Sequence, residues 1–288
     1  MSVEPLSYDT APIGEMVGPI AYTIPADYNR RRLASLGVAE DAFLPGAGFA
    51  EPSLLCGQHS WVMRQRYSWQ GSVHAKCEIA LIKPVALGAR IHVTCGLASK
   101  YERRGGRYVV FALETRGDNG ELVCHVENSM LLNFREVAAG RSEASAANAD
   151  AAAPTDERLA LSIGLGTKTL RRDDIVDFFT AEEAVYGPHP SLHNRTEIAQ
   201  AAGLPDVIAP GRYSIALMNC MFARLYGASW LSGARYSVTF LQNLLPGLRL
   251  RAAATIEGQG DALSFNIASI DETMNRPVLS GTASFAPA

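Results

Sequence analysis

Two stretches of the chain carry apolar residues around most of a helical circumference. Residues 53–65 include Trp61 and Met63 in a helical, mostly apolar pattern. Residues 211–226 are apolar on most faces, which is typical of a buried helix. Pro210 stands just before this second stretch, where proline costs a helix least. The pattern therefore predicts two central helices, one in each half of the chain.

Strand-like segments follow each predicted helix. They show partial alternation and are enriched in β-branched and aromatic residues, and turn signals such as the Gly-Asp-Asn-Gly of residues 117–120 separate them. The predicted strands are 72–82, 90–99, 108–116 and 122–133 in the first half, and 236–241, 249–257, 262–270 and 277–285 in the second. Each half thus repeats one helix followed by an antiparallel meander, which is an α+β arrangement.

A segment of small residues separates the two halves. Residues 137–154 read VAAGRSEASAANADAAAP and contain no bulky apolar residue after Val137. Such a segment buries little apolar area, so we expect it to be exposed or poorly ordered. We predict an N-terminal unit over residues 1–136, a linker over 137–156 and a C-terminal unit over 157–288.

Composition excludes several classes of protein. Of the 288 residues, 48% are hydrophobic and 19% are charged, and the net charge of -3 argues against a nucleic-acid partner. The five cysteines are dispersed and form no CxxC pair, so neither a metal site nor a disulfide framework is expected. The first residues do not read as a signal peptide, and no apolar run approaches the roughly 20 residues that span a bilayer. We expect a cytoplasmic protein without a membrane partner.

Residues 174–218 resemble the signature of the MaoC-like (R)-specific enoyl-CoA hydratases and hydroxyacyl-thioester dehydratases of the double hotdog type. That signature contains Gly-Asp-x-Asn-Pro-Leu-His, and later a His-Gly pair that heads the central helix. Here Gly187 falls on the first glycine, Leu192 and His193 fall on the Leu-His pair, and Gly211 heads the helix. The first half of the chain resembles the family more weakly.

The resemblance implies a fold and a reaction. The fold has two long central helices, each wrapped by an antiparallel sheet, with the two sheets joined into one. The reaction adds or removes water at the α,β-double bond of an acyl thioester, carried on coenzyme A or on an acyl carrier protein, without a cofactor. A homodimer is possible in such a family.

Three prolines depart from the signature. The motif aspartate falls on Pro188, the motif asparagine on Pro190, and the histidine of the His-Gly pair on Pro210. Proline has neither an acid nor a side-chain donor. Either a short insertion shifts the register, or the acid–base pair is altered.

The resemblance also implies roles for individual residues. In the family an aspartate and a histidine share one water, and a backbone N–H at the helix start stabilises the thioester oxyanion. His193 and the Gly211 amide match two of these groups. Stand-ins for the lost acid are His189 and Tyr186, with Glu182 and Glu183 as more distant candidates. The predicted substrate-binding residues are Asn194, Arg212, Ile215 and Met218.

Arg212 stands out because the helix dipole disfavours a cation at a helix start. An anionic ligand would explain that placement. The remaining histidines have plainer interpretations: His59 is expected in the core, and His74, His92 and His125 on strands. The arginines of residues 30–32 and 103–104 suit either a solvated surface or an anionic carrier.

Two other functions stay open. A repurposed double hotdog without the motif aspartate would bind an acyl or polyketide-like ligand, or catalyse a cyclisation or isomerisation. A thioesterase would need a carboxylate near a central helix, and Glu51 is the candidate.

Overall fold

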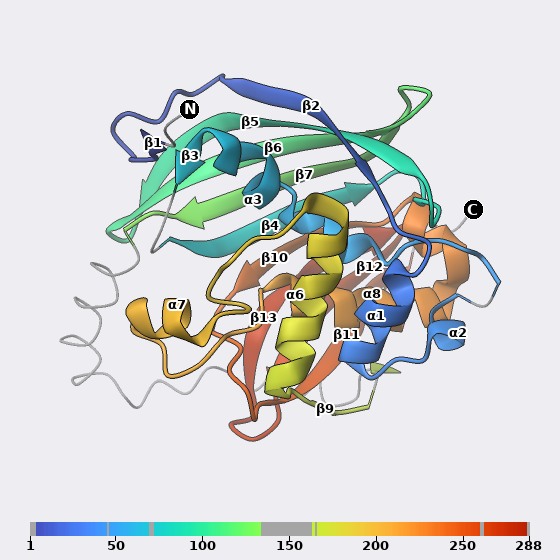
Figure 1. Cartoon of the computed structure of the whole chain (residues 1–288). Helices are drawn as coiled ribbons and strands as arrows, with labels where there is room; N and C mark the ends of the chain where they lie inside the picture. Colours follow the sequence, from blue (N-terminus) through green and yellow to red (C-terminus); the bar gives the residue numbers. More distant parts are fainter. Residues whose placement is uncertain are drawn as a thin grey trace.

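One long antiparallel sheet, with helices packed on one of its faces, forms the molecule (Figure 1). The computed structural model describes residues 4–44, 46–68, 72–133, 163–164, 166–259 and 262–286. The strand order in the sheet is β2-β5-β6-β7-β4-β10-β13-β12-β11-β8, and β9 also pairs with β11. A separate short pair joins β1 (Glu4–Pro5) to β3 (Tyr67–Ser68).

The sheet divides into two consecutive halves of the chain. The strands of the N-terminal half are β2 (Met16–Thr23), β4 (Val73–Leu81), β5 (Arg90–Arg103), β6 (Gly106–Gly117) and β7 (Leu122–Leu131). Those of the C-terminal half are β8 (Ile163–Gly164), β9 (Lys168–Thr169), β10 (Arg235–Phe240), β11 (Arg249–Gln259), β12 (Leu263–Asp271) and β13 (Arg276–Phe285). The halves join where β4 pairs antiparallel with β10, in a register that sets Cys77 opposite Val238.

The two central helical segments lie where the apolar pattern predicts them but differ in regularity. In the C-terminal half, α8 (Arg212–Tyr226) is a continuous helix. In the N-terminal half, the stretch expected as one long helix is divided into η1 (Pro52–Gly57), α3 (His59–Val62) and η2 (Met63–Gln65). The division falls at Gly57. Among residues other than proline, glycine has the lowest propensity for a helix interior.

The remaining helices cover the inner face of the sheet and its ends. α6 (Arg172–Tyr186) lies beside α1 (Tyr28–Leu36) across the front of the molecule (Figure 1). The short ones are α2 (Glu40–Phe43), α7 (Thr196–Ala201) and η3 (Gly227–Ser232). None of the described helices is long and apolar enough to cross a membrane.

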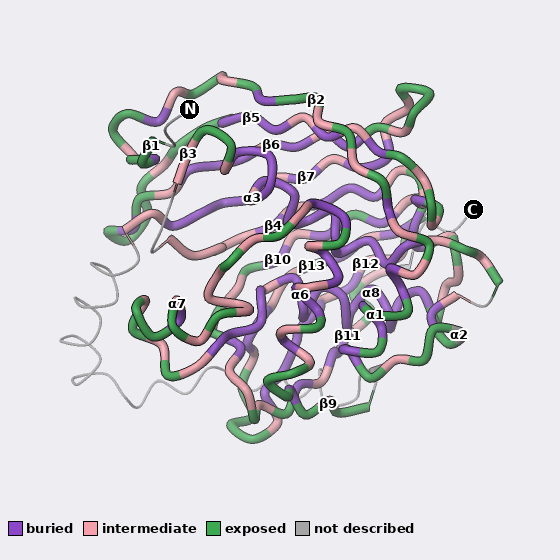
Figure 2. The backbone as a smooth tube through the Cα atoms, in the orientation of Figure 1, coloured by how far each residue is buried: buried purple, intermediate pink, exposed green. Residues whose placement is uncertain are grey.

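The core lies between the sheet and these helices, where Figure 2 shows the buried backbone. It includes Trp61 and Trp230, each about 1% exposed, and all five cysteines, which are buried and unpaired. The continuous antiparallel sheet with a helical segment inside each half confirms the predicted double hotdog fold. The predicted linker, 137–156, lies outside the described residues, so its exposure and the two unit boundaries stay predictions.

Candidate active site

A cavity of about 740 Å³ opens between the two halves of the molecule. Its C-terminal wall is largely apolar, and His193, Gly211 and Arg212 stand in it. Its N-terminal wall is mostly polar and consists of His59, Ser60, Arg64, Tyr67, Ser68, Ser72, Val73, His74 and Met130. The cavity therefore brings together residues that are far apart in the sequence. One of its walls is largely apolar and the other is mostly polar.

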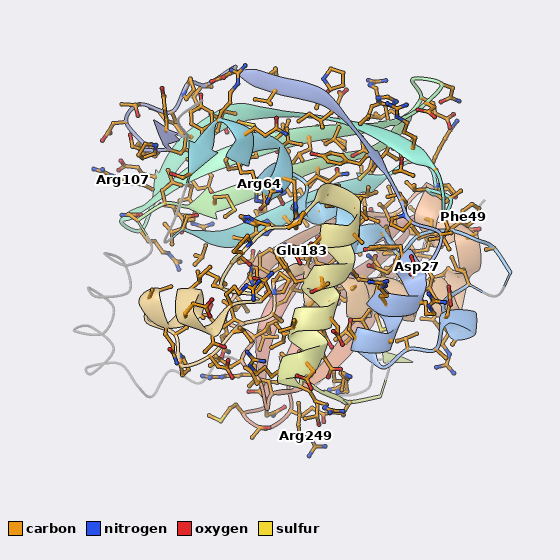
Figure 3. All side chains as sticks on the ribbon, in the orientation of Figure 1. Asp27, Phe49, Arg64, Arg107, Glu183 and Arg249 are labelled. Atoms are coloured by element: carbon orange, nitrogen blue, oxygen red, sulfur yellow. The ribbon has the colours of Figure 1, made fainter. Side chains whose placement is uncertain are left out.

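The loop after α6 carries the two motif-region histidines. Glu183, on the last turn of α6, accepts the backbone N–H of His189 at 2.7 Å and the Asn194 amide at 3.1 Å. The Asn194 side chain in turn accepts the Ser191 N–H at 2.9 Å. Glu183 and Asn194 thus fix the shape of the loop and do not line the cavity. Figure 3 labels Glu183 and Arg64, the cation that approaches this loop from η2.

His193 is held in one tautomer by the backbone. Its Nδ1 lies 2.7 Å from the Ile208 carbonyl oxygen, which only accepts, so Nδ1 carries the proton and Nε2 carries the lone pair. Burial, reinforced by the positive charge of Arg212, lowers the pKa of His193 to about 3. The imidazole is therefore neutral at pH 7, with its lone pair on Nε2.

His189 also lines the cavity, packed against the Trp61 and Phe179 rings at centroid distances of 6.0 and 6.3 Å. Burial and the charges of Arg64 and Arg212 lower its pKa to about 4. Pro188, which occupies the motif aspartate position, is exposed and outside the cavity lining. Of the stand-ins weighed for the lost acid, His189 is thus the one that reaches the cavity.

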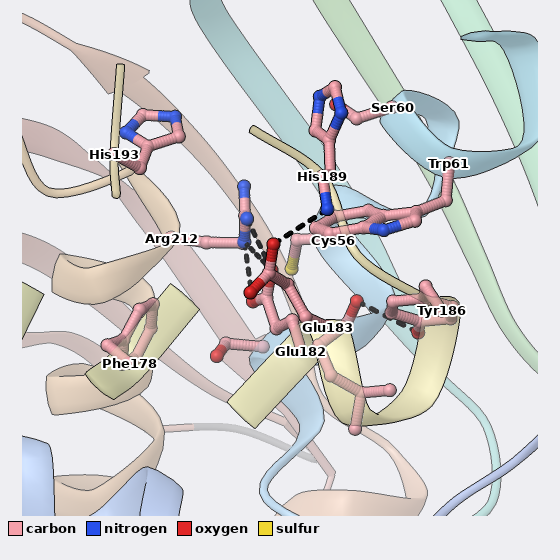
Figure 4. Close-up of polar contacts among 12 residues, drawn as sticks. Cys56, Ser60, Trp61, Phe178, Glu182, Glu183, Tyr186, His189, His193 and Arg212 are labelled. Atoms are coloured by element: carbon pink, nitrogen blue, oxygen red, sulfur yellow. Dashed lines mark hydrogen bonds and ion pairs between the residues drawn. The ribbon is translucent and has the colours of Figure 1, made fainter. Parts of the chain in front are cut away.

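Arg212 lies between the two imidazoles (Figure 4) and ends in a buried ion cluster. Its Nε donates to both Glu182 oxygens at 2.6 and 2.8 Å. Arg32 from α1 contacts the same carboxylate at 2.7 Å and approaches Glu51 to 3.4 Å. Glu51 also accepts the Asn219 amide at 3.0 Å. Both carboxylates are committed to buried partners, and neither lines the cavity, so neither can serve as its base.

Gly211 precedes the first turn of α8, and its N–H has no acceptor among the described residues. A Cβ at this position would come within 2.6 Å of the Phe240 ring, so only glycine lets that ring pack directly on the backbone. A free N–H at the positive end of a helix is suited to stabilise an oxyanion.

Besides Glu182, Glu183 and the expected substrate-binding residue Asn194, three further sequence-based candidates lie away from the cavity. Tyr186 remains within α6, where its hydroxyl accepts from Gln58 at 3.1 Å and contacts the Leu54 carbonyl at 3.4 Å. Ile215 and Met218 are 0% and 2% exposed, and neither lines the cavity. The expectations that Tyr186 donates a proton and that Ile215 and Met218 wall the acyl pocket are therefore corrected by the structure.

The structure adds two histidines that the sequence reading passed over. His59, expected in the core, is buried but borders the cavity, and His74, expected to be an ordinary strand residue, does so too. His92 and His125 instead pair with Asp118 and Glu127 on the surface. Which strand histidine borders the cavity depends on how the two halves of the sheet pack. A local sequence pattern does not contain that information.

The position of Arg212 depends on Gly57. A Cβ at Gly57 would lie 2.9 Å from Nε and 3.0 Å from Cζ of Arg212. We therefore expect Gly57→Ala to displace the guanidinium or to destabilise the protein by about 1–3 kcal/mol, the usual scale for overpacking. Chemical denaturation measures this change, and Gly166→Ala, whose added Cβ meets nothing within 4 Å, is the control. Equal stability and activity of the two variants would contradict the expected role of Gly57.

Comparisons with known proteins agree with the fold. No family model matches the sequence, and no curated protein matches it. HtdX of Mycobacterium tuberculosis is 17% identical, with 93% of this chain and 99% of that chain covered and a TM-score of 0.64. A MaoC-like dehydratase of Phytophthora capsici is 12% identical, covers 98% of both chains and has a TM-score of 0.68. A further Mycobacterium tuberculosis protein, described as a double hotdog, is 12% identical over 99% of both chains with a TM-score of 0.62. At these identities the likeness shows the fold, a double hotdog shared with MaoC-like dehydratases.

Proposed function

We propose that this protein is a hydro-lyase that adds or removes water at the α,β-double bond of an acyl thioester. The observation that carries the proposal is the position of His193: a neutral imidazole, fixed by Ile208, borders the same cavity as Gly211, whose N–H has no acceptor among the described residues. A base and an oxyanion donor facing one cavity are the two groups that thioester hydration needs. The carrier is coenzyme A or an acyl carrier protein, and Arg64, on the polar wall, suits its anionic groups.

The proposed mechanism uses His193 for both proton transfers. In hydration, Nε2 takes a proton from water, and the hydroxide adds to Cβ. The electron pair of the double bond moves to the thioester oxygen, where the Gly211 N–H stabilises the enolate. The resulting imidazolium then returns the same proton to Cα, which leaves the enzyme unchanged and one water added. His189 orients the water, in place of the carboxylate that Pro188 cannot supply.

The pH dependence of turnover tests the state of the two histidines. A base whose pKa is lowered is in its active, neutral form at every pH above that value, so kcat/KM is expected to stay level from pH 8 to about 5. It should fall only as the pH approaches the pKa of His189, about 4, and then that of His193, about 3. An acid limb near pH 6.5, the usual value for histidine, would contradict this account.

The folded state should itself become less stable in acid, so its stability must be measured at each pH at which kcat/KM is measured. The unfolded chain binds protons on these histidines below about pH 6.5, whereas the folded chain resists them, so stability falls as the pH drops. Circular dichroism at each pH separates loss of fold from loss of the neutral base.

The reaction class is tested with crotonyl-CoA as the substrate. Loss of the enoyl-thioester absorbance without release of free thiol supports a hydro-lyase. Release of thiol would instead indicate a thioesterase, although Glu51, the carboxylate suggested for that role, is buried with Arg32 and Asn219.

An isomerase is the second candidate, and one observation favours it. Among the described residues that line the cavity, Glu197 is the only carboxylate, and it lies on the exposed helix α7. Moving a double bond needs one base and an oxyanion donor but no acid to release a hydroxyl group. A substrate that shifts its double bond without gaining water would replace the hydro-lyase proposal with this one.

A further inference from the structure

Helix α7 turns one of its faces toward the cavity. Glu197, Ile198, Ala201 and the C-cap residue Ala202 line the cavity, and their spacing places them on one side of the helix. Ala199 lies on the other side, where it is 0% exposed and outside the cavity lining. Apart from Glu197, the face that meets the cavity is therefore apolar, and the alanines leave space in front of it.

Contacts at both ends hold α7 in this orientation. At its start, the Arg172 guanidinium of α6 donates to the Thr196 hydroxyl at 2.8 Å and contacts Asp206 at 3.4 Å. At its end, the Leu204 N–H donates to the Ala199 carbonyl at 3.0 Å. The helix therefore presents a defined face to the cavity, although it stands apart from α6 and α8 (Figure 1).

The segments on either side of α7 in the sequence line the same cavity with apolar residues. Leu192 precedes the helix, and Ile208 and Ala209 follow it. The Ile208 N–H donates to the Leu192 carbonyl at 3.2 Å, and the Ala209 N–H donates to the Leu244 carbonyl at 2.8 Å, so these backbone groups are paired. We call this part of the cavity the α7 slot, and it is lined by Leu192, Ile198, Ala202, Ile208, Ala209 and Leu244.

The α7 slot is continuous with the proposed reaction site through Ile208. The Ile208 carbonyl oxygen accepts from His193 Nδ1 at 2.7 Å, and Ile208 itself lines the slot. A substrate whose double bond lies at His193 therefore has the slot beside its acyl chain. The N-terminal wall of the cavity is mostly polar, and a hydrocarbon chain gains less free energy against polar side chains than against apolar ones. That wall suits the carrier arm, whose amides form hydrogen bonds.

We propose that the α7 slot binds the hydrocarbon chain of the acyl group, so that the substrate is a medium-chain apolar 2-enoyl thioester. Ile198 and Ala202 are only partly buried, and a bound chain would remove their apolar surface from water. The cavity of about 740 Å³ lies within the range of sites that enclose ligands larger than a crotonyl group. This inference rests on the proposed function for the reaction, and it adds the substrate class. It also assigns to α7 the pocket wall that was expected from Ile215 and Met218 on α8.

The test compares crotonyl-CoA with 2-octenoyl-CoA on the whole protein. Each methylene that a chain buries improves binding by about fourfold, so kcat/KM should be at least about tenfold higher for the octenoyl substrate. In Ala202→Phe, whose ring would occupy the slot, the ratio of the two kcat/KM values should fall to about one. Gln200→Phe adds the same ring at an exposed position of α7 outside the cavity lining, and it should leave the ratio unchanged.

A second variant removes apolar surface from the slot without adding bulk. Ile198→Ala deletes part of the α7 face that would contact the chain, and it should lower the same ratio by about threefold or more. A ratio that stays at its wild-type value in both Ala202→Phe and Ile198→Ala would overturn the proposal.

A binding measurement separates this inference from the reaction itself. Butanoyl-CoA and octanoyl-CoA carry no double bond to hydrate, and calorimetry gives their affinities for the wild-type protein and for Ala202→Phe. Tighter binding of octanoyl-CoA to the wild type, lost in Ala202→Phe, supports the slot even if neither enoyl thioester is turned over, in which case only the proposed reaction fails. Equal affinities together with turnover of crotonyl-CoA would overturn the slot and leave the reaction standing. Failure to bind either thioester would overturn both.

Discussion

Replacing His193 with alanine is expected to lower kcat by about two to four orders of magnitude, the scale of a lost acid–base group. The proposed mechanism assigns both proton transfers to this imidazole, so no other group takes over when it is removed. The fold should survive, because the side chain is half-buried and makes one hydrogen bond, to Ile208, whose loss costs about 1 kcal/mol. Steady-state kinetics with a 2-enoyl thioester measures the effect.

Two further variants show whether the loss belongs to the site. His92→Ala removes a surface imidazole that pairs with Asp118, and it should keep full activity. His189→Gln should be damaging as well, since groups that handle one water act as a unit. Full activity of His193→Ala on the true substrate would mean that the family chemistry does not carry over to this chain.

Glu182→Gln is expected to destabilise the protein by about 3–5 kcal/mol, the usual result of removing one partner from a buried ion pair. The Glu182 carboxylate is fully buried and contacts both Arg32 and Arg212. Its loss would leave two buried guanidinium groups with Glu51 as the remaining acid of the cluster. The free energy of unfolding, from denaturant titration, measures the change.

The matched control for this variant lies on the same helix. Asp177→Asn makes the equivalent change at an exposed position of α6 and should stay within about 0.5 kcal/mol of the wild type. Equal stability of the two variants would mean that the ion pairs of Glu182 with Arg32 on α1 and Arg212 on α8 do not stabilise the fold.

The periodicity of the sequence was enough to predict two central helices, each followed by an antiparallel meander, and the resemblance to the MaoC-like family supplied the double hotdog arrangement. Apolar residues on most faces of 211–226 indicated a buried helix, and α8 is buried from Arg212 to Ala223. The first central segment was placed correctly, but its apolar pattern did not show the division after Gly57, where the Arg212 side chain packs against the glycine from a distant part of the sequence.

The site was predictable only where a local motif exists. His193, Gly211 and Arg212 were found from one continuous stretch, and all three line the cavity. Tyr186 was misplaced because α6 continues through it and turns its hydroxyl toward Gln58. His59 and His74 were missed because their meeting through Asn128 is set by strand pairing and by the packing of the helical segment on the sheet.

The fate of solvent hydrogen tests the central claim most directly. The protein is incubated with a 2-enoyl thioester in D₂O, and the product is examined by NMR. A hydro-lyase that uses His193 should give a 3-hydroxyacyl thioester carrying one deuterium at Cα, and His193→Ala should form this product more slowly by about two to four orders of magnitude. A 3-enoyl thioester that carries deuterium at Cα but has gained no water, or a free acid with released thiol, would contradict the account.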